Sequence, residues 1–169
     1  MKKILIMDDM NYPSDLDEIY RVAVRGIIFI EGKLLMIENS MGELKLPGGG
    51  IDDGEDDYKA LVREVKEETG YDVIIDTIEP FGEIEEKRMS TIEPKIWHQI
   101  SRLYFCKVNP TKGQCNYTED ETRLGFRQVL YSIEEALEKS KRLLEKDDVQ
   151  AWNRREYKTL LLIRDYLRR

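Results

Sequence analysis

Apolar side chains follow two different periods along this chain, and each period predicts a different secondary structure. Segments rich in β-branched and aromatic residues, bounded by turn residues, are typical of strands. Strands are expected over 20–30, 33–38, 72–86, 96–108 and 126–131, with a short one at 2–7. Glu31 and Gly32 separate the first two long segments and predict a hairpin turn.

Three further stretches carry apolar residues at helical spacing. Helices are expected over 56–69, 133–146 and 148–168. Strands and helices therefore follow one another in a mixed order, without strict strand–helix–strand repeats, and the sequence predicts an α/β protein.

The helix at 133 carries a complete start signal. Ser132 and Glu135 form a capping box, and Tyr131 and Ala136 are placed as a hydrophobic staple. Ser132 is therefore expected to precede the first helical residue.

The last helix has a weaker start signal and a longer apolar stripe. Asp147 and Gln150 resemble a second capping box. The residues that follow at helical spacing are expected to pack in the core: Val149, Trp152, Leu160, Ile163 and Leu167. By contrast, the polar segment 109–122 predicts a loop.

Composition and charge narrow the kinds of function that fit. With 169 residues and 41% hydrophobic side chains, the chain suits one domain with a real core. A net charge of -7 and a pI near 5.0 disfavour nucleic-acid binding, which requires a basic face. No stretch is long and apolar enough for a signal peptide or a membrane span, so cytoplasmic location without membrane contact is expected.

The chain has few residues for sulfur or imidazole chemistry. His98 is the only histidine, which excludes a histidine-based triad and a cluster of histidine ligands. Cys106 and Cys115 are too few to define a zinc site and are interpreted as structural thiols. Any bound metal is therefore expected to have oxygen ligands.

The helix predicted at 56–69 concentrates carboxylates on one side. At about 100° per residue, Glu64, Glu67 and Glu68 lie on the same side, with Asp57 under the same row. A separate arc is expected to face the core, and it is formed by Tyr58, Leu61, Val62 and Val65. Asp56 is the expected N-cap and Gly70 the left-handed residue that ends the helix. Clustered carboxylates suit Mg²⁺ or Mn²⁺, hard ions that prefer oxygen.

A run of three glycines, 48–50, precedes this helix. Bare backbone can turn sharply and come close to a ligand or a metal. Taken alone, a glycine run is most often only a loop, and this one lacks the Lys-Ser/Thr of a P-loop.

Together, the glycines and the helix resemble the Nudix box, G-x5-E-x7-R-E-U-x-E-E-x-G-U, in which U is usually aliphatic. The matching residues are Gly49, Glu55, Arg63, Glu64, Val65, Glu67, Glu68, Gly70 and Tyr71. Tyr71 is the one departure. The resemblance implies an α/β/α sandwich with a mixed β-sheet, formed by a single domain over 1–169 with an N-terminal extension (1–19) and C-terminal helices (133–169).

The resemblance also implies an activity: hydrolysis of a nucleoside diphosphate linked to another group X, with Mg²⁺, or Mn²⁺ in its place. Glu64, Glu67 and Glu68 would be metal ligands, and the Gly49 carbonyl a further one. Arg63 would orient Glu64 or Glu67, and Glu64 is one candidate for the general base.

Three residues are candidates for supporting roles. Glu55 would contact Arg63 or the outer shell of the metal. Glu121 would add a carboxylate from a later segment, although a solvated loop explains that segment equally well. Arg25 would reach a substrate phosphate, with pairing to surface acids as the alternative.

The substrate stays open at this stage. A proline that marks ADP-ribose hydrolases after the box has no counterpart, since Pro80 comes too early and Pro94 too late, and Lys-Arg-Met at 87–89 replaces a tyrosine typical of dinucleoside polyphosphate hydrolases. We expect a nucleoside triphosphate or an oxidised nucleotide, with ADP-ribose or a nucleotide sugar as the alternative. A non-catalytic nucleotide sensor and a cysteine-dependent isomerase share the fold, and a homodimer is compatible with the resemblance.

Overall fold

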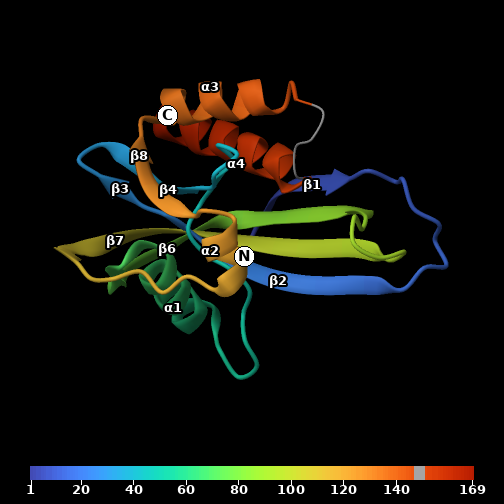
Figure 1. The fold of residues 1–169 in the computed structure, drawn as a ribbon, viewed down its shortest axis with the longest axis horizontal. Coiled ribbons are helices and arrows are strands. Elements are labelled where there is room, and N and C mark those ends of the chain that lie inside the picture. The colour runs from blue at the N-terminus through green and yellow to red at the C-terminus, as the bar shows by residue number, and fades with distance from the viewer. Residues whose placement is uncertain (147–150) are drawn as a thin grey trace.

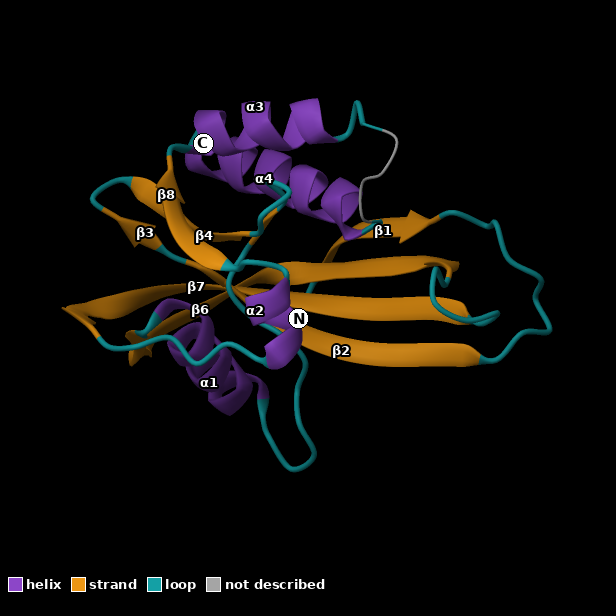
Figure 2. Cartoon of the chain, viewed as in Figure 1, coloured by secondary structure: helices purple, strands orange, loops and turns teal. Residues whose placement is uncertain are grey.

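The computed structural model describes residues 1–146 and 151–169 and contains two β-sheets with helices on both sides (Figures 1 and 2). The larger sheet has the strand order β1 (Lys3–Asp8), β6 (Tyr71–Met89), β7 (Ile96–Lys112) and β2 (Glu18–Ile27). β6 and β7 are antiparallel, whereas β1 runs parallel to β6 and β2 parallel to β7. The sheet is therefore mixed, as expected.

The second sheet is antiparallel and centres on β4 (Lys33–Glu38). This strand pairs with β3 (Phe29–Ile30), β5 (Leu44–Lys45) and β8 (Arg127–Tyr131). The predicted hairpin at Glu31 and Gly32 is confirmed, because Ile30 pairs with Lys33 and both turn residues have positive φ. The two-residue strand β5 was missed, since so short a segment has no readable period.

The helices cover opposite sides of the strands (Figure 1). Helix α1 (Asp57–Thr69) packs on β6 and β2, while α3 (Ile133–Leu143) and α4 (Trp152–Leu167) pack on each other and on the strands of the second sheet. One apolar cluster lies under α1 and another under α3 and α4. The expected α/β/α arrangement is confirmed.

Local signals at the ends of α1 fix its position. The Asp56 side chain accepts a hydrogen bond from the Lys59 backbone N–H at 2.9 Å, and Gly70 adopts a left-handed φ of 74°. Leu61 and Val65 are fully buried in the cluster under the helix. Burying each of these side chains stabilises the fold by about 1.5–3 kcal/mol, which holds the opposite face of the helix outward.

Two expectations for α1 were wrong. Tyr58 is exposed, because it lies in the first turn, beyond the edge of the apolar cluster, where its ring meets the edge of Tyr104. Asp57 does not join the carboxylate row, since it accepts hydrogen bonds from Arg102 and Tyr104 on a neighbouring surface.

The predicted start of α3 is confirmed, because Ser132 and Glu135 form both hydrogen bonds of the capping box. In α4, Leu160 and Ile163 are buried as expected. Leu167 is about half exposed, because the helix runs past the end of the core. The proposed capping pair Asp147 and Gln150, and Val149, lie outside the described residues.

The segment 109–122 is more ordered than predicted. Strand β7 continues to Lys112, and a short helix, α2 (Glu119–Arg123), begins after Thr118. Thr118 and Glu121 form a capping box, the same kind of signal (Ser or Thr followed three residues later by Glu) that was recognised before α3 but not here.

In the parts of the chain that the structure describes, no helix combines the length and the apolar character that crossing a membrane requires.

Candidate active site

The glycine run lies alongside strand β2 and forms the floor of the site. Val24 N–H donates to the Gly49 carbonyl at 2.9 Å, and Gly26 N–H donates to the Pro47 carbonyl at 2.8 Å. At Gly48, which has a φ of 138°, a β-carbon would lie 2.1 Å from the Val24 carbonyl oxygen. Only glycine allows the loop to approach the strand this closely.

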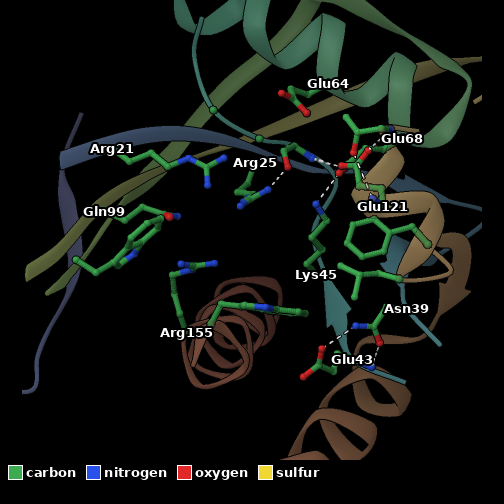
Figure 3. Close-up of a pocket in the computed structure, with 18 of the residues that line it drawn as sticks. Arg21, Arg25, Asn39, Glu43, Lys45, Glu64, Glu68, Gln99, Glu121 and Arg155 are labelled. Atoms are coloured by element: carbon green, nitrogen blue, oxygen red, sulfur yellow. Dashed lines mark hydrogen bonds and ion pairs between the residues drawn. The ribbon is translucent and has the colours of Figure 1, made fainter. Parts of the chain in front are cut away.

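A cleft of about 750 Å³ opens over this loop (Figure 3). Its walls come from α1, the tip of the β6–β7 hairpin, α2 and α4. The cleft brings together seven residues predicted from the sequence: Arg25, Gly49, Arg63, Glu64, Glu67, Glu68 and Glu121. Glu55 is not part of the lining but contacts Arg63, which is.

Glu68 is the deepest of the predicted carboxylates. Its side chain is 1% exposed and accepts hydrogen bonds from Gly48 N–H at 2.8 Å and from Lys45 Nζ at 2.5 Å. Burial raises the pKa of Glu68, and the Lys45 ammonium opposes that shift. Lys45 also lies 4.8 Å from the centre of the Phe126 ring, so its charge is fixed at this position.

Arg63 connects the other carboxylates. Its guanidinium donates to both oxygens of Glu55 at 2.8 Å, to Glu64 at 2.8 Å and to Glu67 at 3.2 Å. A further N–H donates to the Gly50 carbonyl at 3.1 Å, which ties the helix to the glycine loop. The Arg63 hydrogen bond is the main cause that lowers the pKa of Glu55 to about 2.

A comparison with known protein families identifies the family to which this site belongs. Residues 19–156 match the NUDIX domain. The chain belongs to the Nudix family. The carboxylates and glycines described above are the Nudix box, as the sequence predicted.

The most similar proteins include hydrolases of nucleotide derivatives. An ADP-ribose pyrophosphatase from Methanocaldococcus jannaschii is 47% identical over 53 residues, covering 29% of this chain and 31% of that protein. Nudix hydrolase 2 from Arabidopsis thaliana is 30% identical over 110 residues, covering 60% of this chain and 36% of that protein. The chain thus spans about a third of the length of these curated relatives.

Solved structures agree on the fold. The crystal structure of an ADP compounds hydrolase aligns with a TM-score of 0.57 and 23% identity, over 88% of this chain and 73% of that one. At this level of identity the likeness establishes the shared Nudix fold, while the chemistry depends on the site itself.

The Nudix helix offers a donor set that suits a divalent metal. Glu64, Glu67 and Glu68 supply hard carboxylate oxygens along one side of the cleft. Glu64 lies directly on the glycine loop, since a β-carbon at Gly49 would be 2.5 Å from its carboxylate. The three side chains therefore fit Mg²⁺ or Mn²⁺ in chemistry.

The same carboxylates are neutralised by protein cations in this structure. Arg63 contacts Glu64 and Glu67, and Lys45 contacts Glu68. Among the described residues, no three acidic, histidine or cysteine side chains are gathered closely enough to form a ligand set. The Gly49 carbonyl, which already accepts from Val24, keeps one lone pair for a further partner.

Glu121 lies at the cleft from the opposite side, on α2. Its carboxylate accepts a hydrogen bond from the Thr118 backbone N–H at 2.9 Å, which orients it as the third residue of the capping box. The structure thus brings this residue to the site, and its role in the chemistry stays a prediction.

Arg25 reaches the cleft as predicted, and donates a hydrogen bond to the Gly48 carbonyl. Arg88 and Trp97 also line the cleft. His98 does not, because it is held between Glu18 and Glu85 at 2.9 and 2.8 Å.

The cleft residues that were missed include Arg21, Lys45, Trp152 and Arg155. Arg21 could have been found, because it lies four positions before Arg25 on the same face of one strand. Trp152 was expected in the core and instead lines the cleft. Arg155 carries no local signal, since only the packing of α4 brings it to the site.

Proposed function

We propose that the protein is a metal-dependent pyrophosphohydrolase that cleaves a nucleoside diphosphate linked to another group X. The observation that carries this proposal is the complete row of box carboxylates on α1, facing one cleft across a glycine loop. Retention of all three carboxylates, Glu64, Glu67 and Glu68, also favours catalysis over the non-catalytic sensor.

Glu64, Glu67 and Glu68 would hold Mg²⁺, with the Gly49 carbonyl beside them. When bound, the metal would neutralise negative charge on the diphosphate and lower the pKa of a bound water. To bind the metal, each carboxylate would give up part of its present contact with Arg63 or Lys45.

Side chains around the metal ligands would position the reaction. Arg63 holds Glu64 against the glycine loop, so that a Glu64 carboxylate oxygen can accept the proton of the attacking water. Glu55 fixes Arg63 through two hydrogen bonds. Lys45 and Arg25 supply positive charge where the negative charge of the diphosphate would lie.

Within this class we favour a substrate with an organic group on each side of the diphosphate, such as ADP-ribose, over the nucleoside triphosphate expected from the sequence. The cleft has aromatic side chains in two places, Phe126 beside Lys45 and Trp97 beside Arg88, and each suits a base or a sugar. The relative from Methanocaldococcus jannaschii, an ADP-ribose pyrophosphatase, supports the same choice.

A substrate screen tests this proposal. ADP-ribose, UDP-glucose, dGTP and 8-oxo-dGTP are incubated with the protein and Mg²⁺, and the products are separated by anion-exchange chromatography. We expect ADP-ribose and water to give AMP and ribose 5-phosphate at the highest kcat/KM. Preference for dGTP or 8-oxo-dGTP would favour the nucleoside triphosphate substrate that was expected from the sequence. No turnover of any of the four compounds would contradict the proposed function.

The screen includes matched variants. Glu64→Gln removes one charge from the carboxylate row, whereas Glu79→Gln makes the same change at an exposed position on β6. We expect at least a hundredfold loss for Glu64→Gln and wild-type rates for Glu79→Gln, with roughly 10²-fold typical of a lost catalytic group.

A further inference from the structure

Three buried N–H groups lack a hydrogen-bond partner in the part of the chain that the structure describes. They are Arg25 Nε, Trp97 Nε1 and Arg155 Nε. All three belong to residues that line the cleft, and Arg25 and Arg155 are only 6% and 4% exposed. Leaving a buried donor unpaired costs about 1–3 kcal/mol, so three in one place point to an acceptor that the protein itself does not supply.

The arginines around these donors are only partly engaged in ion pairs. Arg21, Arg25, Arg88 and Arg155 line this part of the cleft. The carboxylates that pair with them are Glu86, which contacts Arg88 and Arg155, and Glu156, which contacts Arg155. Glu64 and Glu68 act electrostatically on Arg21 and Arg25, although they form no ion pair with them. We call this region, with Trp97 and Gln99, the arginine chamber.

Two of these arginines, Arg21 and Arg25, are left without an ion pair. Neither has a carboxylate partner among the described residues, and the single acceptor of Arg25 is the Gly48 carbonyl. Burial is the main cause that lowers the pKa of Arg25; Glu156 opposes this shift, and the guanidinium of Arg155 adds to it. Like charges are therefore held close together at the chamber, an arrangement that an anion would stabilise.

A purely structural role explains only part of this arrangement. Arg155 does organise the buried carboxylates, with contacts of 2.7 Å to Glu86 and 3.3 Å to Glu156. These contacts use its terminal nitrogens and leave Nε free. They also give no reason for two unpaired arginines on β2 or for the unpaired indole N–H of Trp97.

The chamber adjoins the Nudix carboxylates. The Gly48 peptide joins the two, because its N–H donates to Glu68 and its carbonyl accepts from Arg25. Figure 3 shows Arg21, Arg25, Gln99 and Arg155 directed toward a common space beside Lys45 and Glu68. An anion in this space would therefore lie next to the carboxylate row.

We propose that the arginine chamber is a phosphoryl-binding subsite, which takes the phosphoryl group of the diphosphate substrate that lies away from α1. Arg21 and Arg25, which have no ion pair, suit anionic phosphoryl oxygens in charge, and guanidinium forks match such oxygens in geometry. The position beside Glu68 favours the substrate itself over an independent phosphate effector. This inference rests on the proposed function and names how the substrate would be held.

Binding without catalysis tests the subsite. The full chain in EDTA is titrated calorimetrically with α,β-methylene-ADP at constant ionic strength, so that neither metal nor turnover contributes. The test variants are Arg21→Gln, which removes an unpaired charge at the rim, and Trp97→Phe, which removes the indole N–H and keeps an aromatic ring. Arg154→Gln is the matched control, since Arg154 neighbours Arg155 on α4 but pairs with Asp9 outside the cleft.

We expect Arg21→Gln to raise Kd about tenfold and Trp97→Phe about threefold, as lost charge-assisted and neutral hydrogen bonds do. Arg154→Gln is expected to bind like the wild type. Thermal unfolding separates binding from structure: Arg21→Gln relieves like-charge repulsion, so its Tm is expected to stay equal or rise. A fall in Tm with unchanged Kd would assign Arg21 a structural role and overturn the subsite.

Inorganic phosphate distinguishes the two sources of the anion. If the chamber holds the substrate's phosphoryl group, phosphate and α,β-methylene-ADP compete, and each raises the apparent Kd of the other. Additive binding of both would place phosphate at a separate site and contradict the proposal. Because these titrations contain no metal, a negative result would overturn the subsite alone. The proposed hydrolysis would still be tested by the substrate screen.

Discussion

The Glu64 carboxylate lies against the backbone of Gly49, so closely that a β-carbon at residue 49 would be 2.5 Å from it. The absence of a side chain at Gly49 thus allows the position of Glu64, a proposed catalytic residue. Arg63 holds Glu64 from the other side at 2.8 Å. The glycine is required by the site and not by the fold.

Gly49→Ala is therefore expected to lose activity while the protein stays folded. The atoms in the way are the end of the Glu64 side chain, which can rotate, so Tm should fall by no more than about 5 °C. The displaced carboxylate should lower kcat/KM about a hundredfold. Steady-state kinetics and a melting curve on the same preparation measure both.

Gly48→Ala provides the contrast. Here the added carbon would meet the Val24 carbonyl at 2.1 Å, and backbone does not rotate away. We expect a large loss of Tm together with a loss of activity. If Gly48→Ala and Gly49→Ala had the same effect on Tm, the distinct role of Gly49 would be wrong.

Glu55→Gln should act through Arg63. The variant removes the charge that fixes the guanidinium, and kcat/KM is expected to fall about 10–100-fold, as for other residues that orient metal ligands. Glu138→Gln, which breaks an exposed pair with Arg142, is the matched control and should keep full activity.

The same variant makes a prediction about acid stability. The folded pKa of Glu55, about 2, is lower than the usual value of 4.5, so its ionised form stabilises the fold at neutral pH. This contribution is complete above about pH 4.5 and is lost as the pH falls toward 2. The difference in Tm between wild type and Glu55→Gln should therefore shrink between pH 5 and pH 2.5, whereas a constant difference would contradict it.

The sequence predicted those features that local signals determine. Asp56 and Gly70 mark the ends of α1, and the helical period alone placed Glu64, Glu67 and Glu68 on one side of it. The box also supplied the partners of Arg63. These contacts all lie within about two turns of helix and one loop, where the distance along the sequence determines which side chains lie close together.

Long-range packing determines the rest, and the sequence did not reveal it. Arg155 reaches the cleft because α4 docks against the strands, where Glu156 accepts a hydrogen bond from the Leu46 backbone N–H, 110 residues away. Lys45 contacts Glu68, 23 residues away, from the short strand β5. The sequence did not predict this strand, so the contact was missed. Charges that act together in the cleft are thus scattered along the chain.

Two leucines of the stripe predicted in α4 should differ in their contribution to stability. Leu160 is fully buried in the apolar cluster under α3 and α4, whereas Leu167 is about half exposed. Leu160→Ala is expected to lower the free energy of unfolding by about 2–5 kcal/mol. Leu167→Ala should cost less than about 1 kcal/mol. Urea unfolding measures both, and equal losses would place the end of α4 in the core after all.

The two cysteines should differ in reactivity. Burial raises the pKa of Cys106 to about 12, so its thiol stays protonated and shielded at pH 8. Cys115 is partly exposed on the segment between β7 and α2. Iodoacetamide followed by peptide mass analysis should label Cys115 first and Cys106 only after unfolding. Rapid labelling of native Cys106 would contradict its burial and would favour a cysteine-dependent isomerase as the function.

The central claim is that three carboxylates of one helix hold the metal, and Mn²⁺ binding followed by electron paramagnetic resonance tests it most directly. Glu64→Gln, Glu67→Gln and Glu68→Gln should each weaken Mn²⁺ binding at least tenfold, while Glu79→Gln should bind Mn²⁺ like the wild type. Unchanged Mn²⁺ affinity in the three box variants would contradict the claim.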